Sequence, residues 1–147
     1  MRKIALLAAV AAAAVAVPAS ANEGRFEARG GIAWAAGVEE AVAGVAAGYD
    51  FDLGTGAFMG VEASADKVLA DGAEVAFGGT ARAGAKLGDA GKLYALAGYT
   101  FNGVEAFHAG AGYEHKVGER VYLKAEYRRY FDFVDFNAAI IGVGMSF

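Results

Sequence analysis

Apolar and polar positions alternate in short segments along most of this chain. The last segment, residues 137–147, is the clearest case: one face carries Ala139, Ile141, Val143, Met145 and Phe147, and the other carries Ala138, Ile140, Gly142, Gly144 and Ser146. A period of two residues is the signature of a β-strand whose two faces meet different surroundings. The C-terminal segment is therefore predicted to be an amphipathic strand.

Seven further segments alternate in the same way: residues 25–35, 43–51, 57–66, 75–87, 93–101, 107–114 and 121–130. The runs between them, including residues 37–40 and 67–73, are predicted to be connections because most of them carry Gly, Asp or Asn. Asn102-Gly103 is typical of a hairpin turn in which both residues have positive φ. Each segment has about the 9–11 residues that a tilted strand needs to cross a bilayer.

Eight such strands can form a soluble, lipocalin-type barrel or a transmembrane barrel, and the facing of the charges separates the two. A soluble barrel points its larger apolar side chains inward, whereas a membrane barrel is apolar outside. Here the charges share a face with glycines, opposite a row of Ala, Val, Leu and aromatic residues. The predicted fold is therefore an all-β, eight-stranded antiparallel up-and-down transmembrane β-barrel. Its predicted lumen charges are Glu27, Arg29, Glu62, Arg82, Lys86, Glu114, Lys124, Glu126 and Arg128.

The outward aromatic residues are predicted to form two girdles. An even number of strands puts both termini on the periplasmic side, so the periplasmic girdle is Phe26, Tyr49, Phe51, Tyr113 and Phe147, and the external girdle is Trp34, Phe77, Tyr99, Phe101, Phe107 and Tyr127. Aromatic residues at both interfaces are typical of membrane barrels. Arg129 shares the outward parity near the external rim, where either snorkelling or a bulge accounts for it.

The N-terminus has the pattern of a secretory signal peptide. Arg2 and Lys3 precede an apolar run, residues 4–17, and Ala19-Ser20-Ala21 supplies small residues for cleavage. The run is shorter than the ~20 apolar residues of a membrane-spanning helix. We therefore predict a signal peptide at residues 1–21 and a barrel domain at residues 22–147.

Composition narrows the possible partners. The sequence has no Cys, so no disulfide is expected. Two of its 13 basic residues lie in the predicted signal peptide, and the remaining 11 face 17 acidic residues, a formal charge of −6 for the mature chain. An acidic chain of this kind gives no reason to expect nucleic-acid binding.

The mature chain resembles the small eight-stranded outer-membrane barrels of the OmpA transmembrane-domain or opacity-type, porin-like family. The likeness rests on Gly48-Tyr49-Asp50-Phe51, Met59-Gly60-Val61-Glu62, Leu96-Ala97-Gly98-Tyr99, Gly112-Tyr113-Glu114, residues 122–127 with Arg128, and Phe147. It implies a barrel of the bacterial outer membrane, surrounded by lipid and inserted by the barrel-assembly machinery, with Phe147 as the assembly signal. We expect a monomer. The external connections are expected to be shorter than those of adhesive members, and we expect no peptidoglycan-binding domain after the barrel.

The lumen is expected to be filled by ion-paired side chains, because eight strands leave an interior just wide enough for side chains. Counting from the turns places Lys124, Glu126 and Arg128 beside Gly112, Gly110 and His108, with Gly144, Gly142 and Ile140 on the other side. The same counting brings Glu62 opposite Arg82 on the neighbouring strand. A narrow conduction path is the alternative.

Catalytic and cofactor chemistry are not expected. The serines of the mature chain, Ser64 and Ser146, are both inward by parity, while His108 lies inward near the external end and His115 is assigned to a periplasmic turn. Neither serine is placed to form a nucleophile–base pair with a histidine, and two distant histidines do not make a metal site.

The sequence therefore favours an integral outer-membrane barrel, not an enzyme, with a structural or general envelope role. Two alternatives stay open. One is a narrow porin-like channel for small solutes. The other is a surface interaction protein that acts through its external connections, for which Val38-Glu39-Glu40 and Val134-Asp135-Phe136 are the exposed apolar–acidic candidates.

Overall fold

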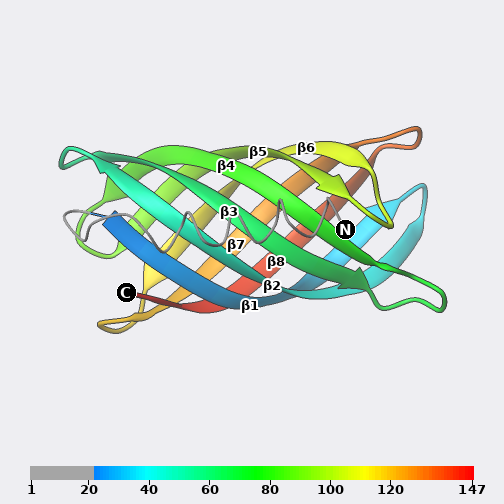
Figure 1. Cartoon of the computed structure of the whole chain (residues 1–147), viewed down its shortest axis with the longest axis horizontal. Helices are drawn as coiled ribbons and strands as arrows, with labels where there is room; N and C mark the ends of the chain where they lie inside the picture. The colour runs from blue at the N-terminus through cyan, green and yellow to red at the C-terminus, as the bar shows by residue number, and fades with distance from the viewer. Residues whose placement is uncertain (1–21) are drawn as a thin grey trace, which may run out of the picture.

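A computed structural model describes residues 22–147, and the predicted signal peptide lies outside the described residues. The described chain forms eight strands in an up-and-down order (Figure 1). They are β1 (Asn22–Ala35), β2 (Val38–Leu53), β3 (Ala57–Val68), β4 (Val75–Leu87), β5 (Gly91–Phe101), β6 (Ala106–Lys116), β7 (Val121–Phe131) and β8 (Phe136–Ser146). Within residues 22–147 no helix is long and apolar enough to span a membrane.

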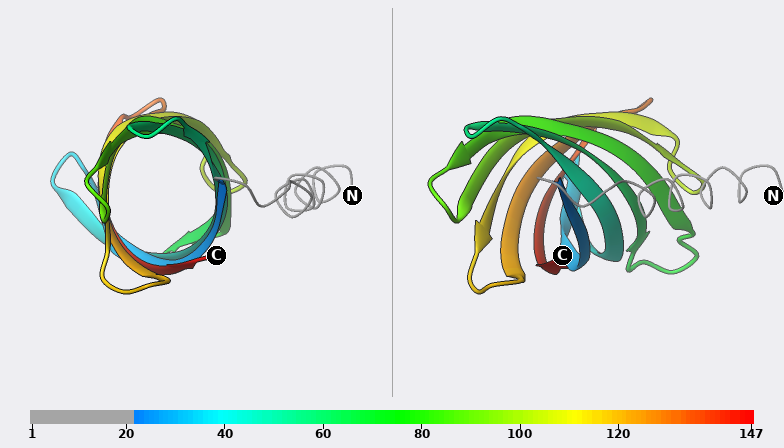
Figure 2. Two further views of the ribbon diagram at one scale, coloured as in Figure 1. Left: turned by 90° about the vertical axis from the view of Figure 1, so that its left-hand side faces the viewer. Right: turned by 60° about the vertical axis from the view of Figure 1, so that its left-hand side comes forward.

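The strands close into a single barrel, as predicted. Each strand pairs antiparallel with the next, and β1 pairs with β8 to complete the ring. Figure 2 shows this ring end-on in its left view. The closing contact extends to the last residue, because Gly24 and Phe147 exchange two backbone hydrogen bonds of 2.9 Å. Closure leaves no unpaired strand edge, which a lipid environment would not tolerate.

The two ends of the barrel differ in what they carry. Residues 22 and 147 lie at one end, together with the connections 54–56, 88–90 and 117–120. We call it the terminal end. The opposite end carries the connections 36–37, 69–74, 102–105 and 132–135, all of which are short. The opposite end is the right-hand end of Figure 1.

Two predicted connections are shorter than expected because strand pairing continues into them. The first turn is only Ala36–Gly37, with φ of 49° and 84°, and residues 38–40 belong to β2 instead of a polar connection. Two residues with positive φ match the twist of a tight hairpin. Likewise, residues 67 and 68 remain in β3, so the third connection begins at residue 69. Asn102 and Gly103 adopt the predicted positive φ, of 64° and 76°.

Side chains alternate between a buried inner face and an exposed outer face along the strands. In β7 every second residue from Tyr122 to Tyr130 is buried, and every intervening one is exposed. The exposed set includes large apolar residues such as Leu123, while Lys124 and Arg128 are buried. A soluble barrel would reverse this arrangement, so the wall is apolar where lipid would cover it.

The residues predicted as girdles lie on the outer face near the two rims. Most are exposed or half-exposed, and Phe147 is 79% exposed. Tyr49 differs, since it is only 8% exposed and its ring packs edge-on against Phe51 at a centroid distance of 5.1 Å. Trp34 and Tyr127 pack together across the β1–β8–β7 wall with ring centroids 6.2 Å apart.

Arg129, for which two explanations were open, faces outward. The β6–β7 pairing runs through it without a bulge, from Phe107↔Phe131 to Lys116↔Tyr122. Its guanidinium reaches the carboxylate of Asp135 at 3.0 Å, beyond the end of the strand. The charge therefore lies at the rim, where an outward arginine costs little.

Candidate functional site

The candidate site is the lumen, where Glu62 on β3 accepts contacts from four cationic side chains. Arg25 Nη1 lies 2.9 Å from Oε2, and Arg29 Nη1 lies 2.8 Å from Oε1. From the far wall, Arg128 Nη2 reaches Oε1 at 3.0 Å and Lys124 Nζ reaches Oε2 at 3.3 Å. These groups come from β1, β3 and β7, so the contacts cross the barrel and fill its middle.

Two further carboxylates compensate the positive charge around Glu62. Glu27 forms an ion pair with Lys124 and accepts a hydrogen bond of 2.9 Å from the Tyr122 hydroxyl. Glu126 lies 2.6 Å from Arg128 and 3.1 Å from Lys124. All of these side chains are buried. Buried charges persist when they are paired and hydrogen-bonded, and this cluster meets both conditions.

A second cluster lies toward the terminal end and is centred on Asp50 of β2. Arg82 holds this carboxylate through two nitrogens, at 2.5 and 3.0 Å. Lys92 donates to it at 2.9 Å, and Arg25 approaches it at 3.4 Å, which joins the two clusters. Arg82 also binds Glu114 at 2.9 Å.

Aromatic rings pack against the cations of the second cluster. The Arg82 guanidinium lies 4.7 Å from the Tyr94 ring centroid and 5.3 Å from that of Phe58. Lys92 Nζ lies 5.2 Å from the Phe58 ring. Both rings are buried in the lumen, so they fill space that would otherwise admit water and also attract the cations. Inward aromatic residues were not part of the predicted lumen set.

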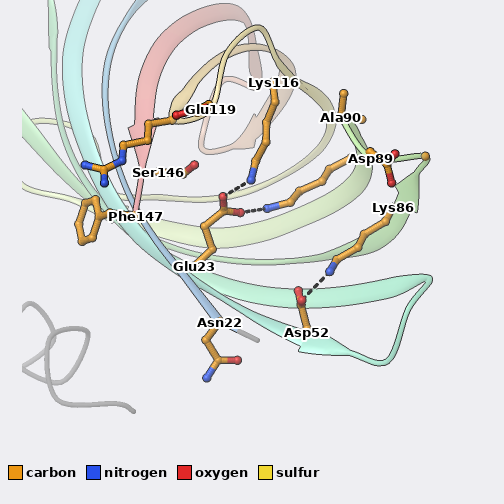
Figure 3. Close-up of a pocket in the computed structure, with 14 residues that line it drawn as sticks. Asn22, Glu23, Asp52, Lys86, Asp89, Ala90, Lys116, Glu119, Ser146 and Phe147 are labelled. Carbon is orange, nitrogen blue, oxygen red and sulfur yellow. Dashed lines mark hydrogen bonds and ion pairs between the residues drawn. The ribbon is translucent and has the colours of Figure 1, made fainter. Parts of the chain in front are cut away.

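At the terminal end the lumen widens into a polar mouth of about 620 Å³ (Figure 3). Glu23 meets Lys92 at 2.6 Å and Lys116 at 2.5 Å within it. Lys86, which was predicted to join the lumen charges, instead pairs with Asp52 at 2.5 Å at the edge of this mouth. The two side chains are 24% and 25% exposed, so this pair is solvated and separate from the central clusters.

Three carboxylates of this region, Glu23, Asp50 and Glu114, lie close enough together to hold a metal ion. The Lys92 ammonium contacts all three, at 2.6, 2.9 and 3.6 Å. A protein cation therefore already occupies the position between these oxygens, and the residues do not fit a resident metal.

The opposite end of the lumen is mostly apolar, which the sequence did not predict; the Arg29–Asp66 ion pair borders this region. Buried Ala106, Tyr130, Ala138 and Ile140 form a cluster, with Ala33, Val104 and Phe136 packed against it. The rings of Tyr130 and Phe136 stack with centroids 4.4 Å apart. Only a hollow of about 60 Å³ remains there. The charged clusters are thus closed on this side by an apolar layer.

The predicted contact between Glu62 and Arg82 is wrong. Arg82 pairs across the strand with Gly60 and Glu62 with Thr80, because the β3–β4 hairpin is centred on Asp71 and not on Gly72. A shift of one residue in the centre of a hairpin moves every cross-strand partner by two positions. Arg82 therefore points to Asp50 and Glu114 instead.

The neighbours predicted for the β7 charges are displaced for the same reason. Lys124, Glu126 and Arg128 lie opposite Glu114, Gly112 and Gly110 on β6 and opposite Gly142, Ile140 and Ala138 on β8. Glycines do leave room for large inward side chains at several positions of the lumen, as expected. A Cβ at Gly112 would lie 2.6 Å from the Tyr94 ring, and one at Gly48 would lie 2.6 Å from Arg25 Nη2.

Arg25, Asp50, Asp66 and Lys92 belong to the network but were not predicted as site residues; Asp66 accepts hydrogen bonds from Arg29 Nε at 2.8 Å and from Arg29 Nη2 at 2.5 Å. Asp50 alternates in step with the inward glycines of its segment, so that signal was present in the sequence. Arg25 and Lys92 lie near the predicted strand starts, where facing is harder to assign. Among residues 22–147, one buried side-chain polar atom lacks a hydrogen-bond partner, Arg25 Nη2. The network is therefore close to fully satisfied.

Both ring nitrogens of the buried His108 are engaged by threonines. Thr80 Oγ1 lies 2.9 Å from Nε2 and Thr100 Oγ1 lies 3.2 Å from Nδ1. His115 lies in β6 and faces outward, not in a turn, and its Nδ1 lies 2.9 Å from the Tyr113 hydroxyl. The hydroxyl partners of the two histidines are therefore threonine and tyrosine side chains, and within residues 22–147 neither histidine forms a hydrogen bond with a serine hydroxyl.

Comparisons with known proteins agree with this architecture. The family model described as "Outer membrane protein beta-barrel domain" matches residues 5–147. Among solved structures, the attachment invasion locus protein Ail of Yersinia pestis superposes with a TM-score of 0.61 at 14% identity, covering 87% of this chain and 99% of Ail. No curated protein matches the chain.

Two other barrels align over similar lengths. Neisserial surface protein A has a TM-score of 0.58 at 15% identity, covering 89% of this chain and 100% of that one. The N-terminal β-barrel domain of Pseudomonas aeruginosa OprF has a TM-score of 0.59 at 17% identity, covering 85% and 97%. At these identities the structures share the fold alone. Since the family model covers nearly the whole sequence, this chain belongs to the outer membrane protein β-barrel family and is a protein of the bacterial outer membrane.

Proposed function

We propose that this protein is a closed, monomeric barrel with a structural role in the outer membrane, and that it neither conducts solutes nor catalyses a reaction. The proposal rests on two layers of side chains that block the lumen, one charged and one apolar. A charged plug centred on Glu62 fills the middle, and the apolar cluster around Tyr130 covers it at the opposite end. A solute would have to displace both.

The energetics of the plug support a closed lumen. Glu62, Arg25 and Arg128 are each less than 5% exposed, and separating one buried ion pair leaves an uncompensated charge that costs about 3–5 kcal/mol. Opening a path would break several such contacts together. The narrow porin-like channel is the competing function, and conductance measurements separate the two.

We expect the purified, refolded protein to produce no discrete current steps in planar bilayers at neutral pH. Heat-modifiable migration in gels confirms that the sample is folded, and a known porin in the same bilayers confirms that insertion is detectable. Reproducible steps whose size rises with salt concentration would contradict the closed lumen and favour the channel.

The same proposal orients the barrel with its terminal end in the periplasm, after export and removal of residues 1–21. The opposite end then faces the exterior. We propose that outer-membrane lipid covers the apolar wall, and that the barrel-assembly machinery recognises the closing strand through Phe147. The exposed Phe147 ring and its backbone bonds to Gly24 support a role for this residue at the closing seam.

Replacing Phe147 with alanine is expected to reduce the folded fraction in outer membranes severalfold while changing the stability of the folded barrel little. The ring lies over Gly24, where a Cβ would come within 2.7 Å of it, so it covers the seam without filling the core. The measurement is heat-modifiable migration of the protein extracted from membranes. Phe133→Ala, an exposed aromatic at the opposite end, is the control. Equal yields from both variants would remove the proposed signal.

One relative suggests a ligand that fits this chain poorly. A structure of Ail holds the heparin analogue sucrose octasulfate and aligns with a TM-score of 0.60 at 13% identity, covering 86% of this chain and 98% of that one. The opposite end of this barrel is acidic, so it would repel a polysulfate. A polysulfated ligand is therefore not part of the proposed function.

A further inference from the structure

The excess negative charge of the barrel gathers at the opposite end. We define the external rim as residues 38–40, 67–74, 102–105 and 129–136. Its basic residues are Lys67 and Arg129, and its acidic residues are Glu39, Glu40, Asp71, Glu74, Glu105, Asp132 and Asp135. Arg129 is already bound to Asp135 at 3.0 Å. The rest of the described barrel holds nine basic and ten acidic residues, so it is nearly neutral.

Large apolar side chains stand exposed among these charges. Phe133 is 101% exposed, and Val38, Leu69 and Val134 are 59–60% exposed. Leu69, Phe133 and Val134 belong to connections beyond the strands, so lipid does not cover them at the end that we place outside the membrane. Adjacent exposed apolar groups bordered by charge, such as Phe133 and Val134 between Asp132 and Asp135, are a feature of interaction sites.

The rim also surrounds an apolar depression in the mouth of the barrel. This is the hollow of about 60 Å³, which is lined mainly by apolar residues, including Val42, Val68, Val104 and Phe136. Two carboxylates also line it, Glu74 and Asp66, and Asp66 is already bound to Arg29. Its size suits one small apolar side chain. A carboxylate beside an apolar hollow suits a ligand that carries a positive charge next to an apolar group.

Hydrogen bonds restrain two of the connections that form the rim. Asn102 Nδ2 donates to the Val75 carbonyl at 2.7 Å, which ties the 102–105 connection to the start of β4. The Phe133 amide donates to the Asp132 carboxylate at 2.7 Å. A surface that is already ordered loses less entropy on binding than a flexible loop does.

From these features we infer that the external rim is a docking surface for a cationic, amphipathic polypeptide segment. Lysine or arginine side chains of the partner would meet the rim carboxylates, and its apolar side chains would cover Phe133 and enter the hollow. Charge complementarity selects this occupant, because a polyanion is repelled and a purely polar cation leaves the apolar groups exposed. This inference goes beyond the closed-barrel role and does not depend on whether the lumen conducts.

The test uses the folded barrel in nanodiscs of phosphatidylcholine, a zwitterionic lipid that does not itself attract cations. The probe is a synthetic peptide of alternating lysine and leucine, compared with an oligolysine of equal charge and with heparin. We expect the amphipathic peptide to bind with an affinity that falls as salt rises, and oligolysine to bind about tenfold more weakly. Heparin binding tighter than the peptide would overturn the inference.

Matched variants locate the binding surface. Glu39→Gln with Asp71→Asn and Glu105→Gln neutralises three exposed rim carboxylates, and Phe133→Ser with Val134→Ser removes two apolar contacts. Each set is expected to weaken peptide binding about tenfold. Asp89→Asn with Glu119→Gln, at the terminal end, is the control and should bind as the parent does. The docking proposal would be wrong if both rim variants bound the peptide as the parent does, or if the control lost as much affinity as they do. Neither result would bear on the proposal that the lumen is closed.

Discussion

Replacing Glu62 with alanine is expected to lower the free energy of unfolding by about 3–5 kcal/mol. Glu62 is the shared partner of Arg25, Arg29, Lys124 and Arg128, all within 3.3 Å. Its removal leaves four buried cations with fewer carboxylate partners in the lumen. Urea unfolding of the refolded barrel in lipid vesicles measures the change.

The solvated pair at the polar mouth supplies the control. Asp52→Asn removes an ion pair with Lys86 that is about one quarter exposed, and such pairs contribute about 0–1 kcal/mol. We also expect the double variant Glu62→Ala with Arg128→Met to cost less than the sum of the two single variants, because the residues share a contact. A Glu62→Ala effect no larger than that of Asp52→Asn would show that the lumen is hydrated and the plug loose.

Replacing Ala63 with arginine is expected to destabilise the barrel by about 2–4 kcal/mol, because it places a charge against lipid near the middle of the wall. Ala63 lies between Ala47 on β2 and Gly79 on β4, and these small neighbours offer no partner for a guanidinium. The same vesicle unfolding assay measures the loss.

Leu87→Arg is the matched control for this second change. Leu87 is exposed on the outer face at the last position of β4, close to the terminal-end rim. A charge there reaches water and is expected to cost about 0–1 kcal/mol. If Ala63→Arg were as mild as Leu87→Arg, lipid would not contact the wall at Ala63, and the assigned facing would be wrong.

Much of the barrel follows from the alternation of residue types, which is a local property. Successive side chains of a strand point to opposite faces. The charged residues alternate on the same face as the glycines, and the apolar residues occupy the other face. This pattern predicts that Glu62 faces inward and Leu123 faces outward. Eight alternating segments gave the strand number, and the absence of unpaired edges in lipid required closure. None of these steps needs knowledge of which strand positions pair.

Cross-strand partners were harder to predict because they depend on where each hairpin is centred. The sequence places the β3–β4 turn near Asp71 and Gly72 but does not choose between them, and the choice decides whether Arg82 or Thr80 lies opposite Glu62. The extension of β2 through residues 38–40 was missed because a valine and two glutamates look like a polar connection. Pairing with β1 overrides that preference.

The sequence by itself determined the class of this protein: an amphipathic strand pattern with an apolar outer face specifies a membrane barrel. Only the tertiary structure decided which charges meet. Arg25 and Glu62 are 37 residues apart and lie on strands that do not pair. Lys124 on β7 reaches Glu27 on β1 past the intervening β8. Barrel closure brings such strands within side-chain reach. The apolar layer arises partly in the same way: Tyr130 and Phe136 already pair in the β7–β8 hairpin, but Ala33 on β1 joins Ala138 on β8 only when the ring closes.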